Sequence, residues 1–245
     1  MKRFLINRMV DLLALGGYET PRRVDLQKGH ERILPLATHA PWSTDIEFLG
    51  IYDLVRQHTL VDRYRCYEVW EILTQIVDLG GDMLEVGVWR GGTAGLICAR
   101  ASRLGFRGTV FLADTFRGVV KAGPEDTTYS GGEHRDTSPA LVDALLRDTL
   151  GVSNYQLLEG VFPEDTGHVA ASHEFSFCHV DVDVYQSARD VFEWVWPRLK
   201  PGGVVLYDDY GFCDGVIKHV DELRGLADRR VIYNLNGHAL VVKLG

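Results

Sequence analysis

The pattern of apolar positions changes near residue 80. Before this point apolar residues recur at helical spacing, as Phe48, Tyr52 and Val55 do after a helix start at residues 44–47. A second helix is predicted over residues 64–79, and a short amphipathic helix over residues 1–17. We therefore expect a helical segment to precede the first strand.

After residue 80, short apolar runs typical of buried strands alternate with helical patterns. The strands are expected at residues 83–88, 109–113, 155–158, 175–182 and 204–207, and the intervening helices begin near residues 91, 140, 187 and 215. Residues 230–233 and 238–242 form a terminal hairpin around Asn236-Gly237, and residues 117–138 form a long loop. Alternating strands and helices give a parallel sheet covered on both faces, so the predicted fold class is α/β.

Composition narrows the class of protein. The chain has 245 residues, of which 46% are apolar and 24% charged, as expected for one large soluble core. A net charge of −8 argues against a nucleic-acid partner. We find no signal peptide and no spanning segment, so we expect no membrane partner and a cytoplasmic location. The four widely spaced cysteines are expected to be reduced.

Glycines and aspartates follow the predicted strands. Ligands of parallel sheets bind outside the carboxyl ends of the strands, so residues at these ends are expected to meet at one edge. They are Gly87, Asp114, Gly160, Asp181, Asp183, Asp208 and Asp209.

The turn after the first strand suits a nucleoside cofactor. Gly87 and the helix opening at Gly91-Gly92 leave bare backbone for a ligand, although such a turn can also serve only to bend the chain. Asp114 can accept hydrogen bonds from both hydroxyls of a ribose, in a nicotinamide dinucleotide or in S-adenosylmethionine. The turn lacks the G-x-G-x-x-G order that a pyrophosphate needs, and a terminal hairpin replaces a second nucleotide-binding half. Both features favour S-adenosylmethionine.

The ends of the fourth and fifth strands carry an acidic cluster. An extended chain places Asp181 and Asp183 on one side, and Asp208-Asp209 is expected to face them. Clustered carboxylates repel one another, and a bound divalent cation removes that repulsion. Ligands that are all oxygen suit Mg²⁺. The alternative is that these aspartates only cap the following helices.

The sequence resembles the macrocin O-methyltransferase family, the metal-dependent sugar O-methyltransferases of antibiotic biosynthesis. The resemblance covers about residues 41–211, and its motifs are Leu84-Glu85-Val86-Gly87-Val88-Trp89-Arg90-Gly91-Gly92, Asp114-Thr115-Phe116-Arg117-Gly118, Asp181-Val182-Asp183-Val184-Tyr185 and Pro201-Gly202-Gly203 to Asp208-Asp209-Tyr210. The stretches 179–185 and 194–197 are most similar to enediyne-pathway sugar methyltransferases.

The resemblance implies a Rossmann-like class I methyltransferase fold, with a seven-stranded, mostly parallel sheet, an antiparallel terminal hairpin and an N-terminal helical lid. Residues 1–80 would be the lid and oligomerisation segment of a homo-oligomer, and residues 81–245 the methyltransferase domain. A metal site for Mg²⁺ would consist of Asp181, Asp208 and Asp209, with Asp183 as a supporting residue or helix cap. S-adenosylmethionine would bind along Glu85, Gly87, Val88, Trp89, Gly91, Gly92, Thr93, Asp114, Thr115, Phe116, Gly160, Phe162 and Asp181.

The expected reaction is attack of a sugar hydroxyl on the sulfonium methyl group, with a small glycosylated molecule as acceptor. Asp181 is the expected general base. His179 is the rival base, although a lone histidine on a strand is more often a core residue. Candidate substrate contacts are Tyr129, His134, Tyr185 and Tyr210, and other aromatic side chains such as Trp70 and Trp194 are expected in the core.

Three other readings of the sequence stay open. A nicotinamide-dependent dehydrogenase is disfavoured by the turn and the acidic cluster. A catechol-type O-methyltransferase acting on a small phenol shares the acidic pattern, and an assay with a simple catechol would separate it. A catalytically silent subunit that binds S-adenosylmethionine is disfavoured by the intact set of three aspartates. The sequence does not specify which sugar or hydroxyl is methylated.

Overall fold

The computed structural model describes residues 38–245, and residues 40–245 form one compact unit built on a seven-stranded sheet. The strand order is β3-β2-β1-β4-β5-β7-β6, with β7 antiparallel to β5 and β6. The strands are β1 (Asp82–Val86), β2 (Val110–Asp114), β3 (Tyr155–Glu159), β4 (Phe175–Val180), β5 (Leu199–Tyr207), β6 (Arg229–Tyr233) and β7 (Ala239–Lys243). The predicted fold class and its terminal hairpin are confirmed.

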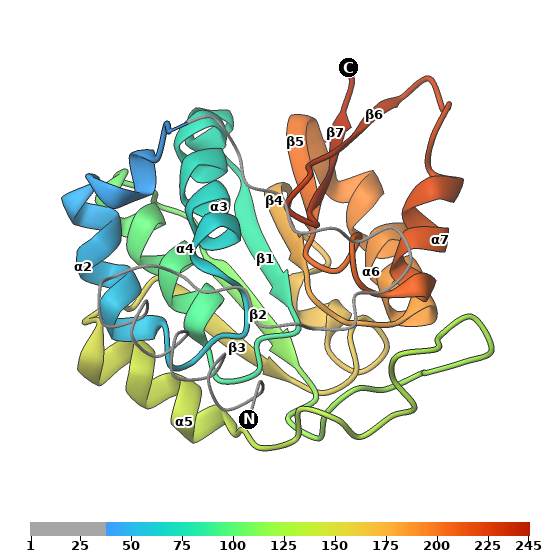
Figure 1. Ribbon diagram of the computed structural model, residues 1–245, viewed down its shortest axis with the longest axis horizontal. Helices are drawn as coiled ribbons and strands as arrows, with labels where there is room; N and C mark the ends of the chain where they lie inside the picture. The colour runs from blue at the N-terminus through green and yellow to red at the C-terminus, as the bar shows by residue number, and fades with distance from the viewer. Residues whose placement is uncertain (1–37) are drawn as a thin grey trace, which may run out of the picture. The chain divides into compact units, whose positions relative to one another are not determined.

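Helices cover both faces of the sheet (Figure 1). One face carries α2 (Ile46–Val55), α3 (Arg63–Ile76), α4 (Gly92–Arg103) and α5 (Pro139–Asp143), and the other carries α6 (Tyr185–Val195) and α7 (Asp214–Glu222). The buried residues accordingly form two clusters, one on each side of the sheet. Four short 3-10 helices complete the described unit, η1 (Pro41–Ser43), η2 (Val77–Leu79), η4 (Gly167–Ala170) and η5 (Trp196–Arg198), and α5 continues into a π-helix, η3 (Ala144–Thr149).

Local sequence explains where the first helices begin. Asp45 caps α2 by accepting a hydrogen bond from the Phe48 amide at 2.9 Å, and Asp62 caps α3 by accepting one from the Tyr64 amide at 2.8 Å. These are the two helices predicted before the first strand. The helix predicted over residues 1–17 lies outside the described residues, and the lid and oligomerisation role of residues 1–80 stays a prediction.

Several boundaries differ from the sequence-based expectation, among them the end of β1, which lies at Val86 and not at Val88. The turn expected at residues 200–203 lies inside β5 as an irregularity, because Leu199 pairs with Phe175 whereas Val204 pairs with Phe177. Strand β4 ends at Val180 rather than at Val182, and Asp183 adopts a left-handed backbone with φ of 65°. We expected Asp181 and Asp183 to lie on one side of an extended strand. The structure contradicts this expectation, because the strand ends before both residues.

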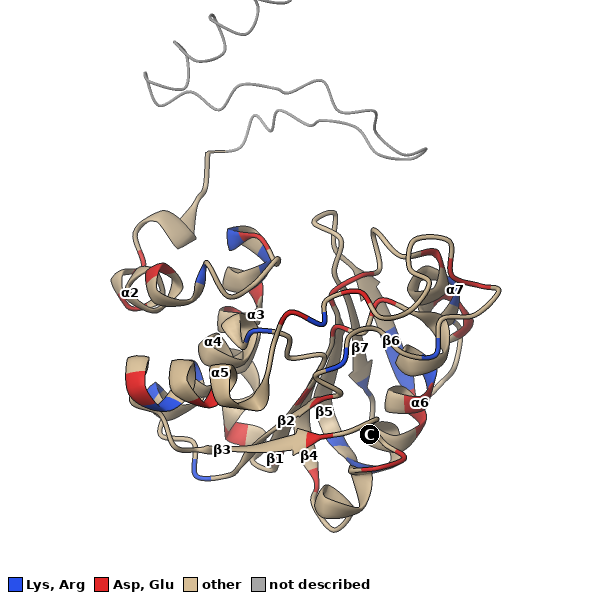
Figure 2. Ribbon diagram, turned by 90° about the horizontal axis from the view of Figure 1, so that it is seen from below, with Lys and Arg blue, Asp and Glu red and all other residues tan. Residues whose placement is uncertain are grey.

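The sequence also led us to expect reduced cysteines, no membrane-spanning segment and a surface with an excess of acidic residues. All four cysteines are buried and free. Within residues 38–245, no helix is long and apolar enough to cross a membrane. Figure 2 shows acidic and basic segments interspersed over the helices and loops of the described unit.

A buried histidine under β5 makes stability depend on pH. The Nε2 atom of His219 lies 2.9 Å from the Tyr207 hydroxyl, and burial followed by the charge of Arg189 lowers the pKa of His219 to about 4. An unfolded histidine binds its proton near pH 6.5, so this contribution to stability is complete above pH 6.5 and is lost as the pH falls toward 4. Between pH 7 and pH 5 the expected loss is about 2 kcal/mol.

We expect His219→Gln to remove this part of the pH dependence. The free energy of unfolding, measured by urea denaturation at pH 7 and pH 5, should fall less on acidification in the variant than in the wild type. The exposed His168 offers a matched control, since His168→Gln should keep the wild-type slope. An unchanged slope in His219→Gln would show that His219 is not held neutral.

Candidate active site

The turn after β1 lies directly against the end of β4. Gly87 has φ of +93°, and a Cβ atom added there would lie 1.6 Å from the backbone oxygen of Asp181. The Asp181 amide also donates to the Val86 carbonyl at 2.9 Å. The missing side chain of Gly87 therefore makes room for the protein's own backbone, and not directly for a ligand as the sequence suggested.

Asp114 joins the end of β2 to the same turn. Its Oδ2 atom accepts from the amides of Val88 and Trp89, at 2.8 Å each, and Oδ1 accepts from the Phe116 amide at 2.6 Å. The Gly160 amide, after β3, donates to the Asp114 backbone oxygen at 2.9 Å. The structure thus brings the cofactor candidates from three strands together, with the Asp114 carboxylate hydrogen-bonded to the turn.

Other cofactor candidates are enclosed by protein. Gly92 opens α4 beneath residues 58–59: its amide donates to the His58 carbonyl at 2.9 Å, and a Cβ atom would lie 2.6 Å from that same oxygen. Thr93 is buried beside it, and Phe116 is buried in the core below α2–α4. Phe162 packs against Trp194 with ring centroids 4.8 Å apart, on the α6 face of the sheet.

The expected acidic cluster is present at the ends of β4 and β5. Asp181, Asp208 and Asp209 each offer a carboxylate oxygen within 4.8 Å of those of the other two, and Asp183, Asp209 and Cys213 form an adjoining group. Asp208 and Asp209 are only 4% and 7% exposed. The carboxyl ends of neighbouring parallel strands thus place three acids around one point, as predicted.

Charge is distributed unevenly within this cluster. Burial, followed by repulsion from neighbouring carboxylates, raises the pKa of Asp181 and of Asp209 well above the ordinary value. Burial also raises the pKa of Asp183 to about 6, although the charge of His134 opposes this shift. Asp208 differs: burial opposes its ionisation, but the hydrogen bond from His238 and the charge of Arg65 outweigh burial and lower its pKa. Among the described residues, no salt bridge reaches the Asp181 or Asp209 carboxylate, and the charge of Arg65 lowers the pKa of Asp209 only in part.

Arg65 and His238 are functional-site residues that the sequence analysis missed. Arg65 NH1 donates to Asp208 Oδ2 at 2.6 Å, and His238 Nε2 lies 2.8 Å from Asp208 Oδ1. A signal was present for Arg65, because a charged residue four positions before Val69 falls on the buried stripe of α3. No comparable pattern marked His238.

His179 is an interior residue of the sheet with a carboxylate partner. Its side chain is fully buried, and Nδ1 donates to Glu85 Oε1 at 2.9 Å. Its Nε2 atom has no hydrogen-bond partner within the described residues and lies 3.9 Å from Asp208 Oδ1. Glu85 is likewise fully buried, so burial raises its pKa although the hydrogen bond from His179 opposes the rise.

The loop over residues 117–138 contacts both the turn after β1 and the acidic cluster. Its Tyr129 hydroxyl lies 3.2 Å from His134 Nε2, and the His134 ring is 6.2 Å from the ring of Trp89. Burial and the charge of Asp183 raise the pKa of Tyr129, so the phenol stays protonated. Asp136 accepts hydrogen bonds from Trp89 Nε1 and from Arg90, which attach the loop to the turn. Tyr129 and His134 therefore lie near the turn and the acidic cluster, and their role as substrate contacts stays a prediction.

Two other aromatic candidates lie elsewhere. The Tyr185 hydroxyl donates to Glu222 at 2.9 Å, and the Tyr210 hydroxyl donates to Asp221 at 2.9 Å, so both are bonded to the surface of α7. Of the two roles expected for Asp183, supporting residue or helix cap, the cap is not observed, and the Asp183 amide donates to Asp209 Oδ2 at 3.2 Å. The first amide of α6, at Tyr185, donates to Asp126 at 2.8 Å, so the cap comes from the loop over residues 117–138.

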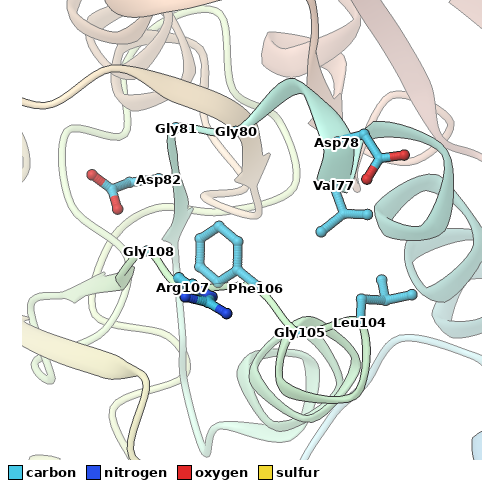
Figure 3. A pocket seen from close by; sticks show the side chains of 10 residues that line it. All are labelled: Val77, Asp78, Gly80, Gly81, Asp82, Leu104, Gly105, Phe106, Arg107 and Gly108. Carbon is cyan, nitrogen blue, oxygen red and sulfur yellow. The ribbon is translucent and has the colours of Figure 1, made fainter.

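A separate cavity of about 330 Å³ lies at the opposite edge of the sheet, beside the amino ends of β1 and β2 (Figure 3). Its acidic residue Asp82 already accepts hydrogen bonds from the Thr109 amide and from His173. The chemistry-bearing residues are therefore at the carboxyl ends of the strands and not in this cavity.

Comparison with known proteins identifies relatives of this chain. Residues 48–235 match the model of the macrocin-O-methyltransferase (TylF) family. The chain is 30% identical over 199 residues to a demethyldecarbamoylnovobiocin O-methyltransferase of Streptomyces niveus, covering 74% of each chain. It is 28% identical over 197 residues to a mycinamicin III 3''-O-methyltransferase of Micromonospora griseorubida, covering 74% of this chain and 76% of the relative.

Solved structures agree on the fold. The O-methyltransferase NovP superposes with a TM-score of 0.65 at 27% identity, over 77% of this chain and 83% of that one. A calicheamicin methyltransferase superposes with a TM-score of 0.62 at 17% identity, over 90% of this chain and all of that one. The second likeness is evidence for the fold alone.

Proposed function

Because the chain belongs to the macrocin-O-methyltransferase family, we propose that it transfers a methyl group from S-adenosylmethionine to a sugar hydroxyl of a glycosylated natural product, with Mg²⁺ bound at the acidic cluster. The relatives named above methylate demethyldecarbamoylnovobiocin and mycinamicin III, which supports an acceptor from antibiotic biosynthesis. The observation that carries the proposal is the convergence of Asp181, Asp208 and Asp209 beside the turn after β1.

The residues of the cluster fit a divalent cation. Three carboxylates offer oxygen ligands around one point, and hard cations prefer oxygen. Burial and mutual repulsion raise the pKa of Asp181 and of Asp209, and the charge of Arg65 offsets only part of this rise for Asp209, so a cation would stabilise both carboxylates. Hydrogen bonds from Arg65 and His238 to Asp208 do not exclude a cation, because ligating carboxylates are commonly hydrogen-bonded as well.

The cofactor would bind along the turn after β1. Asp114 holds the amides of Val88 and Trp89 in place and keeps acceptor capacity for a ribose hydroxyl, since a carboxylate can accept about four hydrogen bonds. The sulfonium cofactor supplies the electrophilic methyl group. The backbone of Gly87 contacts the backbone of Asp181, so a cofactor bound along this turn would lie near the acidic cluster.

Asp181 is the residue that accepts the proton in this proposal. The acceptor hydroxyl would give its proton to an Asp181 carboxylate oxygen as its oxygen takes the methyl group, and S-adenosylhomocysteine would leave with the electron pair of the broken C–S bond. A bound dication lowers the pKa of a hydroxyl that coordinates it.

The loop over residues 117–138 would provide the acceptor side of the site. Tyr129 and His134 lie above Asp183 and can donate or accept hydrogen bonds with a sugar, and the Tyr129 ring offers an apolar face. Tyr185 and Tyr210 are not assigned this role in the proposal, because their hydroxyls are bonded to Glu222 and Asp221 of α7.

Methyl transfer from radiolabelled S-adenosylmethionine tests the proposal. The purified protein should label glycosylated macrolide or aminocoumarin acceptors in the presence of Mg²⁺, lose this activity with EDTA, and regain it when Mg²⁺ is restored. A panel of simple catechols tests the catechol-type alternative in the same assay. Labelling of catechols but of no glycoside, or full activity in EDTA, would contradict the proposal.

A further inference from the structure

Two pairs of side chains converge on the carboxylate of Asp208. On one side, Arg65 NH1 donates to Oδ2 at 2.6 Å, and Arg65 Nε donates to Asp62 Oδ2 at 2.8 Å. On the other side, His238 Nε2 lies 2.8 Å from Oδ1, and His238 Nδ1 lies 2.7 Å from Glu68 Oε2. Each oxygen of Asp208 is thus bonded to a basic side chain, and each of these side chains is bonded in turn to another carboxylate, Asp62 for Arg65 and Glu68 for His238.

Glu68 also attaches the terminal hairpin to α3. Its Oε2 atom accepts from Asn236 Nδ2 at 2.7 Å, and its Oε1 atom accepts from Asn234 Nδ2. These amides and His238 belong to the turn between β6 and β7, whereas Glu68 lies one turn into α3. Glu68 therefore fixes the position of the whole turn that carries His238.

We propose that Glu68 and His238 are positioning residues that orient Asp208 for the cation. The inference rests on the proposed function, in which Asp208 is one of the metal ligands. A histidine that bonds a carboxylate at each ring nitrogen has its ring orientation fixed from both ends. The Glu68–His238 pair thereby limits rotation of the Asp208 carboxylate and leaves the remaining lone pairs of its two oxygens for the cation.

The second buried histidine shows that this arrangement is specific to His238. His179 also donates Nδ1 to a buried glutamate, Glu85, but its Nε2 atom lies 3.9 Å from Asp208 Oδ1 and makes no hydrogen bond among the described residues. Both histidines have a carboxylate on one nitrogen. Only His238 uses its other nitrogen to hold Asp208.

Glu68→Gln is the first test, measured by titration of the full-length protein with Mn²⁺ and detection of free Mn²⁺ by electron paramagnetic resonance. We expect the Kd for Mn²⁺ to rise about 10- to 100-fold, as is typical when a partner of a metal ligand is removed. Binding of S-adenosylhomocysteine should stay unchanged. In the methyltransfer assay, the KM for Mg²⁺ should rise more than kcat falls. Glu71→Gln, one turn further along α3, is the matched control and should bind Mn²⁺ as the wild type does.

His238→Gln should weaken Mn²⁺ binding to the same extent, and it replaces the first variant if Glu68→Gln does not fold. The double variant should be no weaker than either single variant, because the two residues act as one unit. Wild-type Mn²⁺ affinity in folded Glu68→Gln or His238→Gln would overturn the positioning role while leaving the proposed function intact. Failure of the wild type itself to bind Mn²⁺ would overturn the proposed function and the inference with it.

Discussion

Asp181→Asn is expected to reduce kcat for methyl transfer by about 100- to 10,000-fold, the range typical of a lost general base. The substitution is nearly isosteric, so the backbone contact of residue 181 with Gly87 and the hydrogen bond of its amide to Val86 should persist. The Kd for S-adenosylhomocysteine, measured by calorimetry, should therefore stay within a few-fold of the wild-type value.

The exposed Asp148 provides a matched control, and Asp148→Asn should have wild-type activity. A near-normal kcat in Asp181→Asn would show that Asp181 is neither the base nor a required ligand. If activity and cofactor binding were both lost, the change would be structural and would not identify a base.

Gly87→Ala is expected to have the largest effect on stability. Its φ of +93° disfavours any residue with a side chain, and the added Cβ would lie 1.6 Å from the Asp181 oxygen, which is closer than any non-bonded contact. The ends of β1 and β4 would have to separate, so we expect a loss of more than about 4 kcal/mol in the free energy of unfolding. Urea denaturation of the purified variant, or its failure to accumulate as soluble protein, measures this loss.

A substitution at Gly105 measures the stability lost through backbone strain alone, without the steric clash expected at Gly87. Gly105 also has a positive φ, of 73°, but a Cβ atom there meets nothing within 4 Å. Gly105→Ala should therefore cost about 1–2 kcal/mol, the strain of a left-handed residue alone. Equal losses in the two variants would contradict the close contact between the turn and β4.

The sequence was sufficient to predict the sheet and the acidic cluster, because both depend on local patterns. Apolar runs mark β1, β4 and β5, and the rule that parallel strands present their carboxyl ends at one edge brings Asp181 next to Asp208. The helix caps at Asp45 and Asp62 likewise depend on neighbouring residues.

The contacts that hold Asp208 could not be predicted, because they join distant parts of the chain. Arg65 lies 143 positions before Asp208, and Glu68 lies 170 positions before His238. No periodicity relates α3 to the β6–β7 turn, and the pairings depend on tertiary packing. The contacts of Tyr185 and Tyr210 with α7 could not be predicted for the same reason, since an aromatic residue after a strand end can turn either toward the site or toward a neighbouring helix.

The central claim is that aspartates at the ends of β4 and β5 hold the divalent cation needed for methyl transfer. Crystals grown with S-adenosylhomocysteine and MnCl₂ test it most directly through the anomalous difference map. We expect one strong peak within coordination distance of carboxylate oxygens from Asp181, Asp208 and Asp209. A map with no peak there, or with a peak only among His179, Asp208 and His238, would contradict the account.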